Sequence, residues 1–289
     1  MALDTTSYSI PVARNAADLR DTVSNWKREG LKVALVPTMG ALHEGHLSLV
    51  DLASQKADRV VVSIFVNPTQ FAPNEDFSAY PRTEKADAAA LDGRAHLIYA
   101  PNAGDMYPEG FSTTISLTGV TEPLEGEFRP THFSGVATVV AKLLLRTMPD
   151  IAIFGEKDWQ QLMVIRRMVA DLDIPIEIIG GAIMREADGL AMSSRNVYLS
   201  KEERSAAGQL NLILKDVSKA VINGAPIADA TEQGRVKIQK LGFDKIDYLE
   251  IRDAASLASF SSGKLEGAAR ILVAAKIGKT RLIDNMPVE

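Results

Sequence analysis

The first 185 residues alternate between short apolar runs and longer segments in which apolar residues recur at helical spacing. The apolar runs predict buried strands, and the helically spaced segments predict amphipathic helices. The expected strands are 32–36, 59–66, 96–99, 151–154 and 174–179, and the expected helices are 16–29, 45–56, 83–91, 132–146 and 159–169. Continuous apolar strands separated by helices indicate a parallel sheet that is covered on both faces. The pattern therefore predicts a doubly wound α/β domain over residues 1–184.

The pattern changes after about residue 184. Ser200 and Glu203 form a capping-box signature that opens a long helix, which the segment 223–226 ends. A second helix is expected over 227–241, followed by short strands at 246–252, 270–275 and 281–284. Helices followed by strands indicate a smaller α+β domain over residues 185–289. The loop 185–196 would join the two domains, and domain junctions are common ligand sites.

The segment after the first buried strand, PTMGALHEGH at 37–46, combines two glycines with two histidines. His43 and His46 are three residues apart and therefore share one face of a helix. The start of a helix presents backbone N–H groups and a favourable dipole, so the histidines and the turn suit a phosphate group. Two alternatives remain open. The histidines could be ordinary polar residues that cap the helix, or they could belong to a zinc site whose third ligand is not evident.

Polar segments also follow two other predicted strands, and parallel strands bring such segments to one edge of a sheet. Gln70, in the segment NPTQF, offers an amide to a small polar substrate. Lys157, in GEKD, has the length to reach a phosphate, and Gln161 follows one helical turn later on the same side. The alternatives are a plain loop for the first segment and a solvated surface charge for the lysine.

Three polar residues in the predicted interdomain loop complete the candidates. Ser193, Ser194 and Arg195 place two hydroxyls beside a guanidinium, which suits a polyphosphate. The alternative is an ordinary polar loop between domains. Asp87 is interpreted as a carboxylate on a helix surface rather than as a metal ligand.

Composition narrows the class of protein. The chain has 289 residues and a net charge of −5, so no overall basic field would attract a nucleic acid. It has no cysteine, which excludes disulfides, thiolate metal sites and cysteine nucleophiles. The N-terminal segment lacks the basic start and apolar core of a signal peptide. No apolar run approaches the roughly 20 residues that span a bilayer, and we expect a cytoplasmic protein with no membrane partner.

Seven segments of the chain, together with a strand pair near the C-terminus, resemble sequences of the pantothenate synthetase (pantoate–β-alanine ligase) family. The segments are PTMGALHEGH (37–46), SIFVNPTQF (63–71), YPRT (80–83), MYP (106–108), RPTHFSGV (129–136), FGEKDWQQL (154–162), READGLAMSSRN (185–196) and ILVAAKIGKTRLIDN (271–285). The first is also similar to the HIGH-type signature of nucleotidylyltransferases and class I aminoacyl-tRNA synthetases. Thr69 departs from the family pattern, in which methionine is expected, and this difference concerns substrate affinity rather than substrate identity.

The resemblance implies a Rossmann-like core and a smaller domain that closes over the active site. It also implies a two-step ligation with ATP as a substrate and Mg²⁺ as a cofactor. Pantoate would first form pantoyl adenylate and pyrophosphate, and β-alanine would then displace AMP to give pantothenate. A homodimer is implied by the resemblance alone.

The resemblance also assigns residues. His46 is the expected catalytic donor, assisted by His43, Lys157 and Arg195. Gln70 and Gln161 would hold pantoate, and Gln70 would also contact β-alanine. The metal ligands stay unassigned. The residues expected around ATP are Met39, Gly40, Ala41, Leu42, His43, Glu44, Gly45, His46, Gly155, Glu156, Lys157, Asp158, Met184, Met192, Ser193, Ser194 and Arg195.

Three other classes of function compete with this interpretation. A nucleotidylyltransferase would keep the nucleotidyl group in its product, so amine-dependent release of free AMP separates the two. A tRNA-charging enzyme is disfavoured by the short chain and the lack of a basic surface. An inactive nucleotide-binding or scaffold protein would bind ATP without releasing pyrophosphate.

Overall fold

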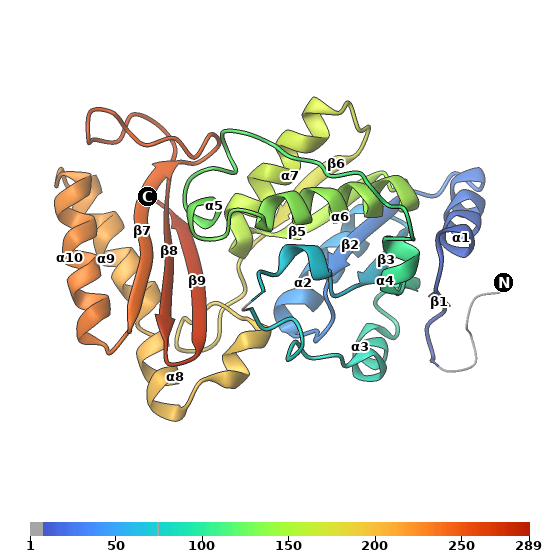
Figure 1. Cartoon of the computed structure of the whole chain (residues 1–289), viewed down its shortest axis with the longest axis horizontal. Coiled ribbons are helices and arrows are strands. Elements are labelled where there is room, and N and C mark those ends of the chain that lie inside the picture. Colours follow the sequence, from blue (N-terminus) through green and yellow to red (C-terminus); the bar gives the residue numbers. More distant parts are fainter. Residues whose placement is uncertain (1–7, 74) are drawn as a thin grey trace. The chain divides into compact units, whose positions relative to one another are not determined.

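In the computed structural model of the chain, six strands form one sheet in which all neighbouring pairs run parallel (Figure 1). Their order is β1-β4-β3-β2-β5-β6. The strands are β1 (Val12–Ala13), β2 (Val33–Thr38), β3 (Arg59–Ile64), β4 (Leu97–Tyr99), β5 (Ile151–Gly155) and β6 (Glu177–Gly181). The central strands are buried from both sides, since Leu35 and Val36, neighbouring residues of β2 that point to opposite faces, have no exposed surface. The predicted doubly wound parallel sheet is confirmed.

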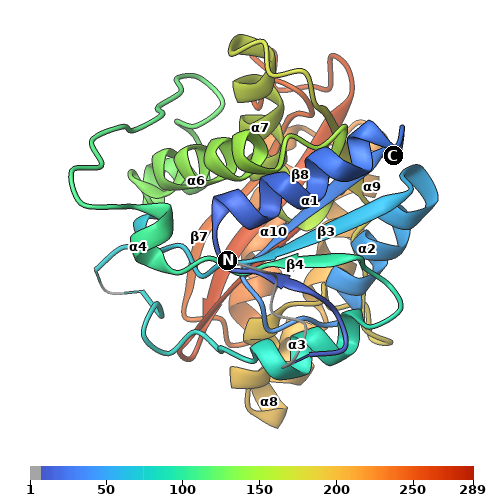
Figure 2. The same ribbon diagram turned by 90° about the vertical axis from the view of Figure 1, so that its right-hand side faces the viewer.

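Helices cover both faces of this sheet (Figure 2). The helices in this part of the chain are α1 (Ala16–Arg28), α2 (Glu44–Lys56), α3 (Glu84–Leu91), α4 (Ala103–Met106), α6 (His132–Thr147) and α7 (Trp159–Asp171). Helices α2 and α3 pack on one face, where Val50 and Leu91 share a buried cluster with Val36 and Val62 of the strands. Helices α1 and α6 contact each other and β2. Alternate strand residues point to opposite faces, which explains why the strand sequences are apolar throughout.

All five predicted strands of this sheet differ from the prediction at one end or both, and β1 was not predicted. Two of these differences have a clear structural reason. Strand β2 continues through Pro37, which pairs with Ser63 of β3. The pairing of β2 with β5 ends at Leu35, so the missing N–H of proline is not needed on that side. Strand β6 begins at Glu177 rather than at Ile174, because the N–H of Ile174 bonds back to the end of α7.

The C-terminal part of the chain forms a second, antiparallel sheet in the order β7-β8-β9. Its elements are α8 (Lys201–Ala207), α9 (Leu210–Ile222), α10 (Ile227–Lys240), β7 (Lys245–Asp253), β8 (Ala269–Ile277) and β9 (Thr280–Pro287). One face of the sheet, with Ile251 and Val273, shares a buried cluster with Leu214 of α9 and Ile238 of α10. The predicted α+β arrangement is confirmed, and the strands are longer than predicted.

The single long helix predicted after Ser200 is in fact two helices, α8 and α9. The capping box is present, since Ser200 and Glu203 each bond the other's backbone N–H. The helix stops at Gly208, where a Cβ would lie 2.5 Å from Oδ2 of Asp188. Asp188 pairs with Arg204 of α8. The absence of a Cβ at Gly208 therefore leaves room for a charged contact that helical periodicity does not reveal.

The structure describes residues 8–73 and 75–289. The first seven residues, on which the expected absence of a signal peptide partly rests, lie outside this range. Among the described helices, none has the length and apolar character that crossing a membrane requires.

The described residues form two compact units. The second unit consists of Gly119–Phe128, Lys157–Met163 and Ile183–Glu289, and the first unit contains the remaining segments. Two short segments from the middle of the chain thus belong to the second unit. The domain boundary placed between residues 184 and 185 stays a prediction.

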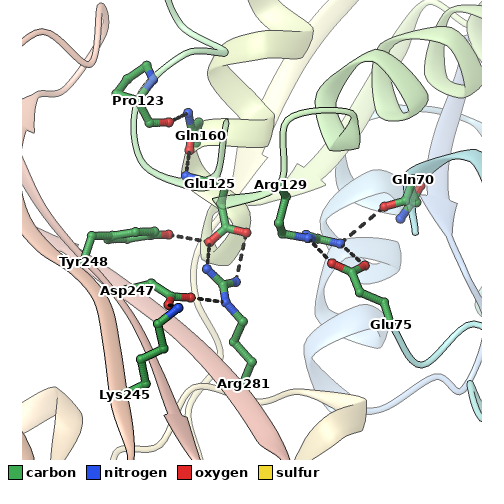
Figure 3. Close-up of polar contacts among 10 residues, drawn as sticks. All are labelled: Gln70, Glu75, Pro123, Glu125, Arg129, Gln160, Lys245, Asp247, Tyr248 and Arg281. Carbon is green, nitrogen blue, oxygen red and sulfur yellow. Dashed lines mark hydrogen bonds and ion pairs between the residues drawn. The ribbon is translucent and has the colours of Figure 1, made fainter. Parts of the chain in front are cut away.

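The segment Gly119–Phe128, which includes α5 (Glu125–Phe128), is held in the second unit by a buried carboxylate (Figure 3). Glu125 accepts two hydrogen bonds from Arg281, at 2.7 and 2.9 Å, and one from the Tyr248 hydroxyl at 2.7 Å. Burial opposes the charge of Arg281, but Glu125 and Asp247 outweigh this effect and raise the pKa of Arg281. Buried ion pairs contribute little net stability, so we interpret Glu125 as a residue that specifies where this segment lies.

In the first unit, helix α6 lies against the short 3₁₀ helix η1 (Pro68–Gln70) at a distance that only glycine permits. A Cβ on Gly135 would lie 2.4 Å from the carbonyl oxygen of Thr69. Asn67 joins the two elements, because its Nδ2 donates to the Gly135 carbonyl at 3.2 Å. The obstacle is main chain rather than a movable side chain, so the position of η1 depends on this glycine.

We expect Gly135→Ala to lower thermal stability, although alanine in a helix is favoured over glycine by about 1 kcal/mol. The added methyl group would push η1 away from α6, and such overpacking costs roughly 1–3 kcal/mol. Thermal unfolding followed by circular dichroism measures the net effect. Gly234→Ala in α10 is the matched control, because the atoms nearest to its Cβ would be side-chain atoms of Leu249, Val217 and Ile213 rather than main chain. An unchanged melting temperature for Gly135→Ala would contradict the proposed dependence.

Candidate active site

The two histidines of the predicted phosphate segment lie side by side at the start of α2. Their ring centroids are 4.1 Å apart. His43 is the N-cap, and its Nδ1 accepts the N–H of Gly45 at 3.1 Å. Nδ1 of His46 accepts the N–H of His43 at 3.4 Å. In a neutral imidazole one nitrogen accepts and the other carries the proton, so both rings hold their proton on Nε2.

The turn before these histidines is shaped by Asp87 of α3. Its carboxylate accepts the N–H groups of Ala41 and Leu42 at 3.0 and 2.8 Å. Asp87 is 3% exposed, so the interpretation of this residue as a surface carboxylate was wrong. Gly40 has φ +82°, and a Cβ there would lie 3.0 Å from Oδ2 of Asp87. Two N–H groups that we expected to face a phosphate therefore bond within the protein, and the imidazoles are the better candidates for donors.

Gln70, the predicted substrate residue, is held through both its main chain and its side chain, and Figure 3 shows its contact with Arg129. Its carbonyl oxygen accepts from Arg129 at 3.3 Å and lies 3.0 Å from Nδ1 of His132, which donates to it. Its side-chain Nε2 lies 3.2 Å from the sulfur of Met39. Arg129 in turn forms two 2.6 Å hydrogen bonds with Glu75. Burial raises the pKa of Glu75, but Arg129 outweighs burial and the net pKa is lowered.

Asn67 organises the loop that carries Gln70. It is 1% exposed, and its Nδ2 donates to Oε1 of Gln70 at 3.1 Å. Its Oδ1 accepts the hydroxyls of Tyr107, at 2.8 Å, and of Thr69, at 2.9 Å. Thr69, which departs from the family pattern, therefore uses its hydroxyl inside this network. Methionine at that position could not make this hydrogen bond.

Lys157 lies in the 3₁₀ helix η2 (Glu156–Asp158), between β5 and α7. Its carbonyl oxygen accepts a 2.7 Å hydrogen bond from Nδ2 of Asn285 on β9. Asn285 is 1% exposed. The main chain at Lys157 is therefore fixed by the second sheet.

Of the two adjacent glutamines on α7, the one that was not predicted makes the structural contacts. Gln160 is 4% exposed and accepts the N–H of Glu125 at 3.0 Å. Its Nε2 donates to the carbonyls of Val120 and Pro123, at 3.0 and 2.7 Å (Figure 3). Gln161 is half-buried on the first turn of α7, and its role in substrate binding stays a prediction.

The predicted polyphosphate loop begins as a short hairpin. The N–H of Met192 donates to the Met184 carbonyl at 3.0 Å, and Arg185 pairs with Ala191 in an antiparallel bridge. The chain then enters the 3₁₀ helix η3 (Ser194–Tyr198), whose N-cap is Ser193. The hairpin thus brings the two predicted methionines together directly before the serines and Arg195.

The predicted site residues are divided between the two units. The first unit contains Met39, Gly40, Ala41, Leu42, His43, Glu44, Gly45, His46, Gln70, Gly155 and Glu156. The second unit contains Lys157, Asp158, Gln161, Met184, Met192, Ser193, Ser194 and Arg195. That both groups act on one ligand stays a prediction.

Sequence reasoning missed the residues that hold the predicted ones. Arg129 and His132 position the main chain of Gln70, and Tyr107 supports Asn67. All three lie in motifs that were quoted for the resemblance, RPTHFSGV and MYP. Their presence in those motifs was the available signal, but no spacing rule connects residues 129 and 132 with residue 70.

Within the described ranges, no three histidine, aspartate or glutamate side chains are grouped as metal ligands. Mg²⁺ commonly keeps several waters and binds through substrate phosphates. The ligands of the expected Mg²⁺ therefore stay unassigned.

The parallel sheet, its covering helices and the paired imidazoles at a strand-to-helix turn place the chain among Rossmann-like α/β proteins. Residues 11–287 match the model of the family described as pantoate-beta-alanine ligase. The chain belongs to this family of ligases.

Individual relatives agree with this assignment. A pantothenate synthetase of Rhodospirillum rubrum is 57% identical over 281 residues, which cover 97% of this chain and 99% of the relative. The crystal structure of pantothenate synthetase from Thermus thermophilus matches with a TM-score of 0.90 and 43% identity, covering 96% of this chain and 99% of that one. A Francisella tularensis pantoate-beta-alanine ligase, described as complexed with beta-gamma ATP and beta-alanine, matches with a TM-score of 0.80 and 35% identity, covering 96% and 97%.

We expect Asp87→Asn to speed hydrogen exchange at the amides of Ala41 and Leu42. The neutral amide is a weaker acceptor than a carboxylate, and its NH₂ group cannot accept from the turn. A hydrogen bond to a charged group contributes ~1.5–3 kcal/mol, so exchange should accelerate roughly tenfold or more. Mass spectrometry of a peptide spanning residues 38–46 measures the rate. Asp92→Asn, at the exposed end of the same helix, should leave it unchanged, and equal rates in both variants would mean that another group orders the turn.

Proposed function

We propose that this protein joins pantoate and β-alanine to form pantothenate, using ATP through a pantoyl-adenylate intermediate and releasing AMP and pyrophosphate. The observation that carries the proposal is the pair of imidazoles at the start of α2, in a chain that matches the ligase family over residues 11–287. The ligands in the Francisella tularensis complex support ATP and β-alanine as ligands here. The resemblance further supports a homodimer, and we expect the enzyme to act in the cytoplasm.

In the first step, a carboxylate oxygen of pantoate attacks the α-phosphorus of ATP. The new acyl–phosphate bond forms as the bond to pyrophosphate breaks. Both reactants are anions, so the site must supply positive charge and preorganised donors. We assign His46 as the main donor and His43 as its assistant, because Nδ1 of each ring accepts a backbone N–H and the proton of each ring is therefore on Nε2.

The second unit supplies the cationic groups in this proposal. Lys157 and Arg195 would contact phosphate oxygens, and the hydroxyls of Ser193 and Ser194 would donate to them. Mg²⁺, held mainly by phosphate oxygens and water, would reduce the remaining negative charge when bound. The full set proposed to surround ATP is Met39, Gly40, Ala41, Leu42, His43, Glu44, Gly45, His46, Gly155, Glu156, Lys157, Asp158, Met184, Met192, Ser193, Ser194 and Arg195.

In the second step, the amine nitrogen of β-alanine attacks the carbonyl carbon of the adenylate. The amide bond forms, the bond to the phosphate oxygen breaks, AMP leaves and the amine releases a proton. Gln70 and Gln161 would hold pantoate, and Gln70 would also contact β-alanine. Holding the amine beside the carbonyl supplies several kcal/mol without a covalent enzyme intermediate. The adenylate needs protection from water, which we assign to closure of the smaller domain.

The test of this function is exchange of labelled pyrophosphate into ATP, with Mg²⁺ and without β-alanine. We expect exchange only when pantoate is present, because reversal of the first step requires pantoyl adenylate. Adding β-alanine should then release free AMP. Exchange that needs a phosphorylated acceptor instead would indicate a nucleotidylyltransferase, and ATP binding with no exchange would indicate an inactive nucleotide-binding protein.

We expect His46→Ala to lower pantoate-dependent pyrophosphate exchange by roughly 10²–10³-fold, the usual loss for one preorganised donor. His46→Asn separates catalysis from helix capping. Its short amide can still accept the N–H of His43 but does not reach the position of Nε2, so it should be as slow as alanine while restoring stability. Parallel exchange assays and melting curves make the comparison. Exchange at the wild-type rate in either variant would remove His46 from the mechanism.

A further inference from the structure

Two neighbouring residues near the end of β9, Asp284 and Asn285, are buried although both are polar. They are 3% and 1% exposed. Neighbouring residues of a strand point to opposite faces of the sheet, so the two side chains can reach different segments. Each contacts a segment that carries predicted phosphate-binding residues.

Asp284 holds the hairpin that precedes Ser193. Its carboxylate accepts two hydrogen bonds from Arg185, at 2.7 and 2.9 Å. The same guanidinium donates to the carbonyls of Gly189, at 3.0 Å, and Asn285, at 3.2 Å. Arg185 therefore links both ends of the hairpin turn to β9. The hairpin that leads into η3 is therefore anchored to β9 through this contact.

Asn285 holds the other segment. Its Nδ2 donates to the Lys157 carbonyl at 2.7 Å, and its Oδ1 accepts from Nε of Arg270 at 2.5 Å. The Arg270 guanidinium lies 3.5 Å from the ring centroid of Trp159, the first residue of α7. Trp159 also donates to the carbonyl of Ala254 at 2.9 Å. The main chain from Lys157 into α7 is thus fastened to the second sheet at two points.

We propose that Asp284 and Asn285 are positioning residues for the nucleotide step. From one strand, they fix the main chain of Lys157 and the hairpin that leads to Arg195, so that both cationic side chains start from defined places. This inference rests on the proposed function. Buried ion pairs and amides contribute little net stability compared with apolar packing, so their use here favours a role in geometry. The Asp284 carboxylate and the Nδ2 group of Asn285 bond to these two segments, which lie outside the sheet.

Asn285→Asp tests the proposal, because it replaces only the side-chain NH₂ group with an oxygen. The carboxylate keeps an acceptor for Arg270 but loses the donor to the Lys157 carbonyl, and it places two oxygens against each other. We expect pyrophosphate exchange to fall at least tenfold with a higher KM for ATP, since small misplacements of reacting groups can cost about 10²-fold. Aminolysis of supplied pantoyl adenylate should change less than about twofold, because that step uses no ATP.

A double-mutant cycle with Lys157→Ala shows whether Asn285 acts through Lys157. In the Lys157→Ala background, Asn285→Asp should have little further effect on exchange, because coupled residues are not additive. A full multiplicative loss in the double variant, or equal losses in both half-reactions, would overturn the proposal. Arg185→Lys provides the corresponding test for Asp284, because a lysine cannot form the two parallel bonds. The Arg185→Lys variant tests the proposal even if the Asn285→Asp variant does not fold.

Glu250→Gln is the control. It removes the partner of Arg252 on β7 of the same sheet and should leave the KM for ATP and both half-reactions unchanged. Melting curves of all variants identify losses caused by unfolding alone. If the wild-type protein itself shows no pantoate-dependent exchange, the proposed function fails. If the wild type exchanges and Asn285→Asp exchanges equally well, only this inference fails.

Discussion

Parallel pairing of β2, β3 and β5 is the constraint on which the rest of the first unit depends. Parallel strands place their carboxyl ends at the same edge of a sheet. The histidine segment and the Gln70 loop each follow one of these strands, and Gly155 is the last residue of β5. Their approach to one another is therefore a property of the sheet, and the loops only have to present the side chains correctly. This explains why apolar strands that contain none of the predicted catalytic side chains still determine where the predicted site residues lie.

Buried polar side chains form hydrogen bonds with the main chain of the loops at this edge. Asp87 accepts from the turn before α2, Asn67 bonds both η1 and α6, and Asn285 accepts and donates beside Lys157. Each would be costly to bury without partners, and each has them. The same residues that satisfy the hydrogen-bonding groups of a loop also restrict it to one conformation. The second unit uses this device as much as the first.

The fold was largely predictable because burial on both faces leaves a continuous apolar signal, as at residues 33–36 and 60–62. The histidine pair was predictable because its cap is formed by residues within the same turn. Contacts between distant residues were not. Asp87 and Ala41 are 46 positions apart, and Asn285 and Lys157 are 128 apart. The glycine at the end of α8 is a similar case, since the space beside Gly208 is occupied by the distant carboxylate of Asp188. The periodicity of apolar residues indicates which face of a helix or strand is buried, but it does not indicate which distant polar residue contacts that face.

The hydrogen bonds of Asp87 have a consequence for how the histidine motif should be understood. Ten consecutive residues look like a portable unit, yet the turn within them takes its form from a carboxylate on another helix. If residues 37–46 were moved onto a different strand and helix, their sequence would be transferred but their conformation would not. The smallest transplantable unit also includes α3 and the strand spacing that holds it against the turn. The conformation of the motif therefore depends on tertiary contacts, although its residues are consecutive in the sequence.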